Sequence, residues 1–334
     1  MNKGIGKKKT SIIIASLLIV LAALVPLVGV ASKYAFYLIS LGIIWTILAI
    51  SADIMLRLGL ASLAQGAFLG LGIYSVALGM TSAHWNWWFC ALVGMVLAAI
   101  TGLGLGLITL RLTGHYFAIG TLAFGIAIER LFENWDSFTH GARGVTGIPE
   151  ISPIKLGSTT LVSFENETSM YYLLVVFLAL VVVVLMRVTS SPFGRALAVI
   201  KSNENLAKAL GINVTKYKVI AFMFSAMVAA LSGALFAPFI HYIHPADASS
   251  HIGFVALIYT VIGGAGTWWG PIIGSQLMVV IPELMRPLQD YRLMIFGVVV
   301  IVVMILVPHG IAGGLKSLYE ILSKRYGGNK KATL

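Results

Sequence analysis

Apolar runs, most of them about 20 residues long, follow one another along almost the whole chain, and this repetition constrains the fold more than any single motif. They lie near residues 11–32, 34–52, 58–80, 87–109, 115–133, 170–187, 217–240, 252–265, 270–285 and 292–309. The hydrocarbon core of a bilayer is about 30 Å thick and needs roughly 20 apolar residues per helix. With 59% hydrophobic and only 10% charged residues, the chain lacks the polar surface of a water-soluble domain. The sequence therefore predicts an all-α, polytopic bundle of transmembrane helices.

Two stretches interrupt this pattern. Gln65 and several glycines fall within 58–80, and Pro271 and Pro282 fall within 252–285. Lipid tolerates an interrupted helix only where protein covers the freed backbone groups. We therefore expect eight to ten spans, with broken or re-entrant helices among them. The first run is long and lacks a clear cleavage site, which favours an uncleaved first helix over a signal peptide.

The positive charges predict the orientation of the bundle. With ten spans and a cytoplasmic N-terminus, 17 of the 23 Lys and Arg residues fall on the cytoplasmic side, together with only Asp53, Glu204 and Glu320 among the 12 acids. Cytoplasmic loops of membrane proteins carry such an excess of positive charge. We therefore expect both termini to be cytoplasmic. The chain then forms one transmembrane domain over 1–334, with an external loop at 134–169, a cytoplasmic loop at 188–216 and a basic cytoplasmic tail at 316–334.

Motifs for chemistry are missing from the sequence. There is no G-x-x-x-x-G-K-[ST] loop to hold the phosphates of ATP and no H-E-x-x-H zinc motif. His241, His244 and His251 have a spacing that could bind a metal, but they lie in a predicted loop with Pro245 and Asp247, and an ordinary loop is the favoured interpretation. We expect no catalytic residue, and no metal or cofactor bound by this chain. The net charge of +11 is spread over short loops and two tails, which favours contact with membrane lipid and no binding of nucleic acid.

The loop between Arg187 and Lys218 contains an amphipathic pattern. Pro192 and Gly194 break the preceding span, and Gly211 is a helix-stop residue. Between them, apolar residues recur at three- and four-residue intervals, at Phe193, Ala196, Leu197, Ile200, Ala207 and Leu210. The pattern predicts a helix of about 17 residues on the cytoplasmic side. Such a helix either lies in the lipid interface or inserts its apolar face into a groove of a cytoplasmic partner.

Two glycine-rich segments have a four-residue repeat. One contains Gly66 and Gly70 next to the polar amide of Gln65, and the other contains Gly266, Gly270 and Gly274. Small residues at this spacing let a second helix pack closely. Broken helices near the midplane are also where transporters often bind solute. Both roles, packing and a solute pathway, remain open for these residues.

Taken together, these segments resemble the membrane permease subunits of ATP-binding-cassette importers for branched-chain amino acids, specifically the larger of the two paired permeases. The resemblance rests on the segments Gln65–Tyr74, Gly114–Phe124, Arg143–Pro149, Ser191–Lys218 and Gly263–Gly274, which occur in this order. The resemblance implies a coupling helix in 188–216 that contacts an ATP-hydrolysing subunit. The matching positions are Gly194, Arg195, Leu197, Glu204, Leu210 and Gly211.

The resemblance also implies partners and a location. The partners are a second homologous permease, two cytoplasmic ATPase subunits that bind ATP and magnesium, and an extracytoplasmic solute-binding protein docking on the side of 144–149. The location is the bacterial cytoplasmic (inner) membrane, crossed many times. The chain is then a transport subunit and not itself an enzyme.

The implied solutes are branched-chain or similar small apolar amino acids. Related permeases for urea, short-chain amides and other amino acids share the same motifs, so these remain alternatives. A stand-alone, ion-coupled secondary transporter is an alternative from another class, although the chain lacks the buried acid–base pairs of a proton relay.

Overall fold

Four long apolar helices frame the molecule in the computed structural model: α2 (Lys33–Leu56), α4 (Trp87–Thr109), α7 (Glu167–Ser190) and α10 (Val214–Ile240). At about 1.5 Å per residue each is long enough to cross a bilayer core of about 30 Å. The structure describes residues 33–286, apart from 113, 157, 158, 163 and 165, and separate residues between 291 and 314. The predicted span 11–32, most of the span 292–309 and the tail 316–334 lie outside the described residues.

Four further helices complete the described bundle: α5 (His115–Asn134), α3 (Gln65–Thr81), α11 (Ser250–Gly263) and α12 (Gly270–Leu284). The last three are about 26, 21 and 22 Å long, shorter than the bilayer core. The chain is not helical over 60–63, before α3, or over 264–266, before α12. Sequence analysis predicted broken helices in these two stretches, and this is where the short helices lie. The described part of the chain is thus an all-α polytopic bundle.

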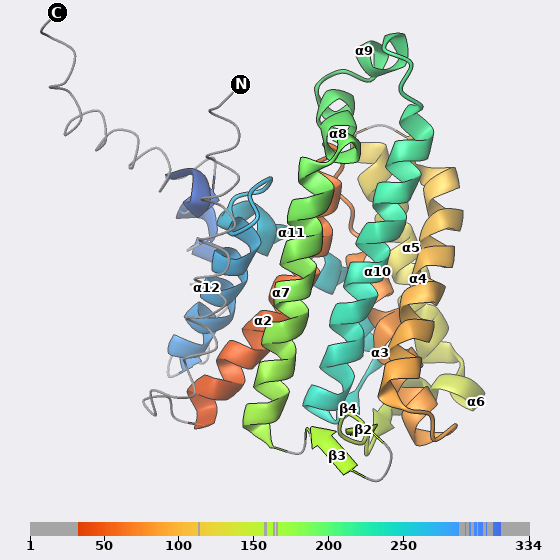
Figure 1. Cartoon of the computed structure of the whole chain (residues 1–334), viewed down its shortest axis with the longest axis vertical. Coiled ribbons are helices and arrows are strands. Elements are labelled where there is room, and N and C mark those ends of the chain that lie inside the picture. Colours follow the sequence, from red (N-terminus) through yellow and green to blue (C-terminus); the bar gives the residue numbers. More distant parts are fainter. Residues whose placement is uncertain are drawn as a thin grey trace, which may run out of the picture.

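The two ends of the bundle differ. At one end stand the short helices α8 (Pro192–Ser202) and α9 (Glu204–Ala209), seen at the top of Figure 1. The segment between α5 and α7, predicted as an external loop, folds at the opposite end into α6 (Asp136–Thr139), η2 (Gly141–Arg143) and the strands β1 (Val145–Thr146), β2 (Ile154–Leu156) and β3 (Thr159–Val162). β2 pairs with β3, and β1 pairs antiparallel with β4 (Tyr242–Ile243), with Val145 opposite Ile243. A further short helix, η3 (Pro245–Ala248), leads from β4 into α11.

Helix α10 lies at the centre of the bundle, where it packs against α2, α3 and α4. Its contact with α3 is backbone to backbone, because a methyl group on Gly233 would overlap the carbonyl oxygen of Leu69. Ser232 Oγ donates to the carbonyl of Ile44 in α2 at 2.8 Å, and Trp87 Nε1 in α4 donates to the carbonyl of Ala234 at 3.0 Å. These bonds satisfy polar groups that lipid could not hydrate.

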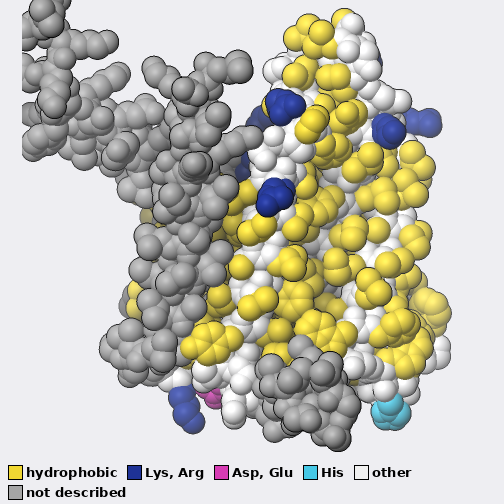
Figure 2. Space-filling view, in the orientation of Figure 1, with side chains coloured by type: hydrophobic (Ala, Val, Ile, Leu, Met, Phe, Trp, Pro, Cys, Tyr) yellow, Lys and Arg dark blue, Asp and Glu magenta, His cyan; other side chains and the backbone are white. Residues whose placement is uncertain are grey.

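The outer surface matches a membrane environment. Figure 2 shows hydrophobic side chains along the flank of the bundle, with most of the visible Lys and Arg side chains toward the end that carries α8 and α9. Eight described bases lie at that end, where α2, α4 and α7 finish and α10 begins: Arg57, Arg111, Arg187, Arg195, Lys201, Lys208, Lys216 and Lys218. We call it the basic end.

Candidate functional site

The segment at the basic end contains two helices where we predicted one, and the prediction of a single helix was wrong at Asn203. This residue is extended (φ −162°, ψ 113°) and ends α8. Its side-chain oxygen then accepts the N–H groups of Asn205 and Leu206 at 2.9 and 3.1 Å and caps α9. Asparagine is among the best N-cap residues, so the chain turns here instead of continuing.

The apolar face of this α8–α9 segment (residues 192–210) is mostly used within the chain. Ala196, Leu197, Ile200 and Ala207 are buried, and the ring of Phe193 stacks on Tyr217 of α10 with 5.2 Å between centroids. The predicted insertion of this whole face into a partner is therefore wrong for those positions. The large apolar side chains of the segment that remain exposed are Leu206 and Leu210, at 50% and 63%.

Of the predicted coupling residues, Glu204 and Arg195 differ in their surroundings. Glu204 forms an ion pair with Lys218 of α10, whose side chain is only 4% exposed. Arg195 is exposed and donates from Nη1 to the carbonyl of Ser190 at 3.4 Å. The pair between Glu204 and Lys218 ties α9 to the central helix, while Arg195 faces outward.

Glycine is favoured at two positions of this segment for different structural reasons. A methyl group on Gly194 would overlap the carbonyl oxygen of Thr189, so glycine permits the close turn from α7 into α8. Gly211 has a φ of +75°, a left-handed conformation that ends α9 and that other residues adopt at a cost.

The N-terminal turns of α3 and α11 lie side by side inside the bundle. A methyl group on Gly66 would overlap the carbonyl oxygen of Ser249, and one on Gly253 would overlap that of Leu63. A methyl group on Gly70 would overlap the Cβ atom of Ala248 in η3. The predicted small-residue stripe is thus in contact with the segment that leads into α11.

Gln65 is fully buried at the same crossing, and both ends of its amide are bonded within the protein. Its Oε1 accepts from Ser51 Oγ of α2 at 3.1 Å, and its Nε2 donates to Ser225 Oγ of α10 at 3.0 Å. Ser225 Oγ in turn donates to the carbonyl of Ser51 at 2.7 Å. The network joins three helices and leaves Gln65 little capacity to bind a solute in this conformation.

The second glycine segment joins α11 to α12. A methyl group on Gly270 would overlap the carbonyl of Gly264, and one on Gly274 would overlap that of Tyr259. Gly266 has no close neighbour but a φ of +84°, so its role is to make the turn.

Sequence analysis counted Asp53 among the acids of the cytoplasmic side and gave it no role, whereas in the structure Asp53 lies in α2 and its side chain organises this turn. The carboxylate is fully buried; Oδ1 accepts the N–H of Gly266 at 2.6 Å and Oδ2 accepts Arg57 Nε at 2.7 Å. Asp53 directly follows the predicted apolar run 34–52 and stands four residues before Arg57, and this spacing was the available signal.

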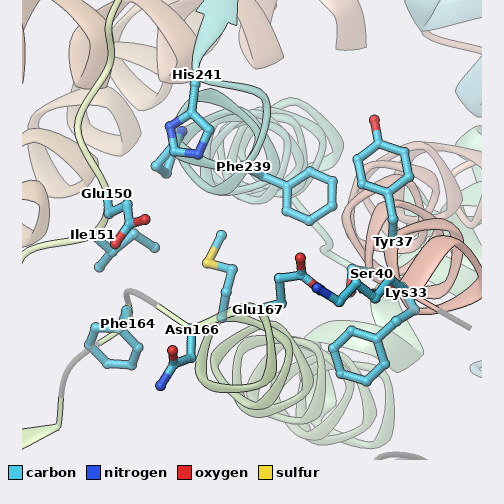
Figure 3. Close-up of a pocket in the computed structure, with 13 residues that line it drawn as sticks. Lys33, Tyr37, Ser40, Glu150, Ile151, Phe164, Asn166, Glu167, Phe239 and His241 are labelled. Carbon is cyan, nitrogen blue, oxygen red and sulfur yellow. Dashed lines mark hydrogen bonds between the residues drawn. The ribbon is translucent and has the colours of Figure 1, made fainter. Parts of the chain in front are cut away.

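At the end opposite α8 and α9, the described residues form a cavity of about 260 Å³ between the starts of α2 and α7 and the end of α10 (Figure 3). Its lining includes Lys33, Glu150, Glu167 and His241, as well as several aromatic side chains. None of these residues was singled out from the sequence, except His241. The Nδ1 atom of His241 lies 2.9 Å from the carbonyl oxygen of Ile148.

Comparisons with known proteins find a matching family and several similar permeases. The family described as "Branched-chain amino acid transport system / permease component" matches residues 34–308. The high-affinity branched-chain amino acid transport system permease protein LivM of Salmonella typhimurium is 30% identical over 286 residues, which cover 80% of this chain and 67% of that protein. LivH of the same organism is 25% identical over 293 residues, covering 82% and 93%.

A relative with a different printed cargo is also similar. The autoinducer 2 import system permease protein LsrC of Yersinia enterocolitica is 26% identical over 287 residues, covering 80% of this chain and 74% of the relative. No solved structure matches the chain.

Proposed function

Because the chain belongs to the family of permease components of branched-chain amino acid transport systems, we propose that it is the larger permease subunit of an ATP-binding-cassette importer for branched-chain amino acids. It would pair with a second, LivH-like permease, sit on two ATPase subunits that bind ATP and magnesium, and receive solute from an external binding protein. Its place would be the bacterial inner membrane, with the basic end and both termini in the cytoplasm.

The observation that carries the proposal is the outward surface of the α8–α9 segment. Leu206 in α9 and Leu210 just after it are exposed. Figure 1 shows α9 at the end of the bundle that carries the excess of Lys and Arg. Two leucines at the tip of a capped helix fit a hydrophobic groove, and the exposed Arg195, Lys201 and Lys208 of the same segment can pair with acidic groups of the partner. An ATPase subunit is the cytoplasmic partner that the family membership suggests.

The ion pair between Glu204 and Lys218 connects the outward surface of the α8–α9 segment to the membrane-spanning helices, so that movement of α9 moves α10. A force on α9 acts on α10 through this pair, and α10 is bonded to α2 and α3 through Ser225. Movement of the ATPase subunits would thus reach the crossing of α3 and α11. Access to the solute would change there because two short helices meet, each free to tilt about a non-helical connection.

The test is assembly and uptake with Leu206→Asp/Leu210→Asp in the complete importer. We expect normal membrane insertion and loss of both co-purification with the ATPase subunits and ATP-driven uptake. Leu112→Asp is the matched control, because Leu112 is an exposed leucine at the same end, outside the α8–α9 segment. Normal ATPase assembly with the double variant would contradict the docking role.

Uptake measurements on the same complex identify the class of transporter and the transported solute. Leucine uptake that requires the ATPase subunits supports the proposal, whereas uptake by the permease alone, driven by an ion gradient, would show a secondary transporter. Parallel measurements with urea, acetamide and autoinducer 2 test the alternative cargoes. Preferential uptake of any of these over leucine would overturn the branched-chain assignment.

A further inference from the structure

The cavity opposite the α8–α9 segment has the chemistry of a site for a free amino acid. We propose that it binds an apolar amino acid as a zwitterion, with Lys33 taking the carboxylate, Glu150 and Glu167 taking the ammonium group, and an apolar floor taking the side chain. The inference rests on the proposed function, because the membrane orientation proposed there, with the basic end in the cytoplasm, puts the cavity on the external face. It adds a solute site on this chain itself, separate from the crossing of α3 and α11.

The charged groups of the cavity lie at the ends of two helices and in the segment between two strands. Lys33 begins α2, Glu167 begins α7 and Glu150 lies between β1 and β2, and all three are exposed. Among the described residues none of them takes part in an ion pair or a side-chain hydrogen bond. Figure 3 places Lys33 on the side of α2 and Glu150 on the side across the cavity. A zwitterion is the small ligand that needs one cation and one anion held apart in this way.

The remainder of the lining separates into a polar mouth and an apolar floor. Asn166 at the mouth precedes α7, and its side chain makes no capping bond. Ile151 and Phe164 are 3% and 7% exposed, and the rings of Phe36 and Phe239 and the thioether of Met170 extend the apolar wall. Small-molecule sites commonly combine such a wall with a few polar groups that fix orientation.

The size of the cavity favours a single amino acid. Its volume of about 260 Å³ has room for a leucine or an isoleucine. The single cation and two carboxylates also disfavour anionic solutes, because the net charge of these three groups is negative.

Direct binding tests the proposal in the complete importer, held in lipid nanodiscs without ATP and without the solute-binding protein. Bound tritiated leucine is measured by scintillation proximity, with two competitors. 4-Methylpentanoate lacks the ammonium group, and 3-methylbutylamine lacks the carboxylate. We expect leucine to bind and each competitor to be at least about tenfold weaker, because each leaves one charged partner unused.

The variants assign the two halves of the zwitterion. Lys33→Gln is expected to weaken leucine binding about fivefold and to remove the preference for leucine over 3-methylbutylamine. Glu150→Gln/Glu167→Gln is expected to remove the preference over 4-methylpentanoate. Glu129→Gln is the matched control, because Glu129 is outside the cavity lining. Unchanged leucine binding in both cavity variants would overturn the inference.

The outcome is separable from the proposed function. If the wild-type importer takes up leucine from its binding protein but binds none without it, the cavity proposal fails and the importer assignment stands. If the variants weaken docking of the binding protein and leave binding of free leucine unchanged, the cavity is a docking recess and the proposal also fails. Absence of any ATP-driven amino acid uptake in the wild type contradicts the proposed function instead.

Discussion

At the residue scale, the crossing of α3 and α11 shows what the spacing of two glycines in the sequence can and cannot predict about helix packing. Gly66 and Gly70, four residues apart, predicted a surface for close packing. The surface they contact is the segment at Ala248 and Ser249, about 180 residues further along the chain, and nothing in the local sequence indicates that partner. Glycine spacing therefore predicts that two backbones approach, and only the fold shows which two.

Substitution of Gly66 by alanine tests this contact. Gly66→Ala places a methyl group on the carbonyl oxygen of Ser249, and backbone atoms cannot move aside cheaply. We expect a loss of about 1–3 kcal/mol of stability, in the range found for overpacked cores. The control is Gly104→Ala in α4, where an added methyl group has no neighbour within 4 Å. The measurement is the thermal midpoint of the detergent-solubilised protein, and equal midpoints for the two variants would contradict the contact.

Gln65 gives a second residue-scale prediction. Gln65→Leu keeps the size of the side chain but leaves Ser51 and Ser225 without their amide partner. Both hydroxyls still donate to backbone carbonyls, Ser51 to Leu48 and Ser225 to Ser51. We expect about 1–3 kcal/mol of destabilisation, because two buried hydrogen bonds of about 0.5–1.5 kcal/mol each are lost. Gln276→Leu in α12 is the comparison, since that amide makes only a 3.5 Å bond to the carbonyl of Ile39. If Gln65→Leu keeps full stability but loses solute binding, Gln65 is a solute ligand and the structural role is wrong.

At the element scale, the long helices and the two broken stretches were predictable from the sequence, whereas the break between α8 and α9 was not. Apolar runs of about 20 residues predict α2, α4, α7 and α10, because length and composition suffice for a transmembrane helix. The break at Asn203 escaped prediction because the apolar spacing continues through it, and a capping side chain outweighed that pattern. The sequence predicted the apolar face of the α8–α9 segment, but it does not tell whether that face packs against the rest of the same chain or against a partner protein.

The attachment of α9 to α10 is an element-scale feature that a double-mutant cycle can measure. Glu204→Gln leaves the ammonium group of Lys218 buried without a counter-charge. We expect Glu204→Gln to cost about 1–2 kcal/mol of stability, since the buried Lys218 loses its counter-charge, whereas the exposed side of Glu204 is already screened by solvent.

The second arm of the cycle adds Lys218→Met. We expect Glu204→Gln/Lys218→Met to recover most of the loss in stability and to remain defective in ATP-driven uptake, because α9 is no longer tied to the central helix. Thermal midpoints and uptake by the assembled importer are the measurements. Full uptake by the double variant would contradict a coupling role for the ion pair.

At the scale of the whole molecule, charge is the sequence property that organises the structure best. The bases assigned to the cytoplasmic side by counting loops and described by the structure all gather at the α8–α9 end, although they come from five separate connections and helix ends. The cavity at the other end was not predictable, because its lining comes from residues 33–40, 150–170 and 238–241, which only the bundle brings together.

Cysteine labelling tests the orientation of the whole molecule in the membrane. The chain has one cysteine, Cys90, which is buried, so Cys90→Ser gives a background without reactive thiols. Ala142→Cys and Ala209→Cys are matched probes, since both alanines are exposed and lie at opposite ends of the bundle, in η2 and α9.

A membrane-impermeant maleimide applied to spheroplasts, in which the outer membrane is opened, should modify Ala142→Cys and leave Ala209→Cys unmodified until the inner membrane is permeabilised. The physical reason is the positive-inside distribution, which keeps the basic end in the cytoplasm. Labelling of Ala209→Cys in sealed spheroplasts would place the α8–α9 segment outside. That result would remove the ATPase-docking role and the external position of the cavity together, because both follow from the same orientation.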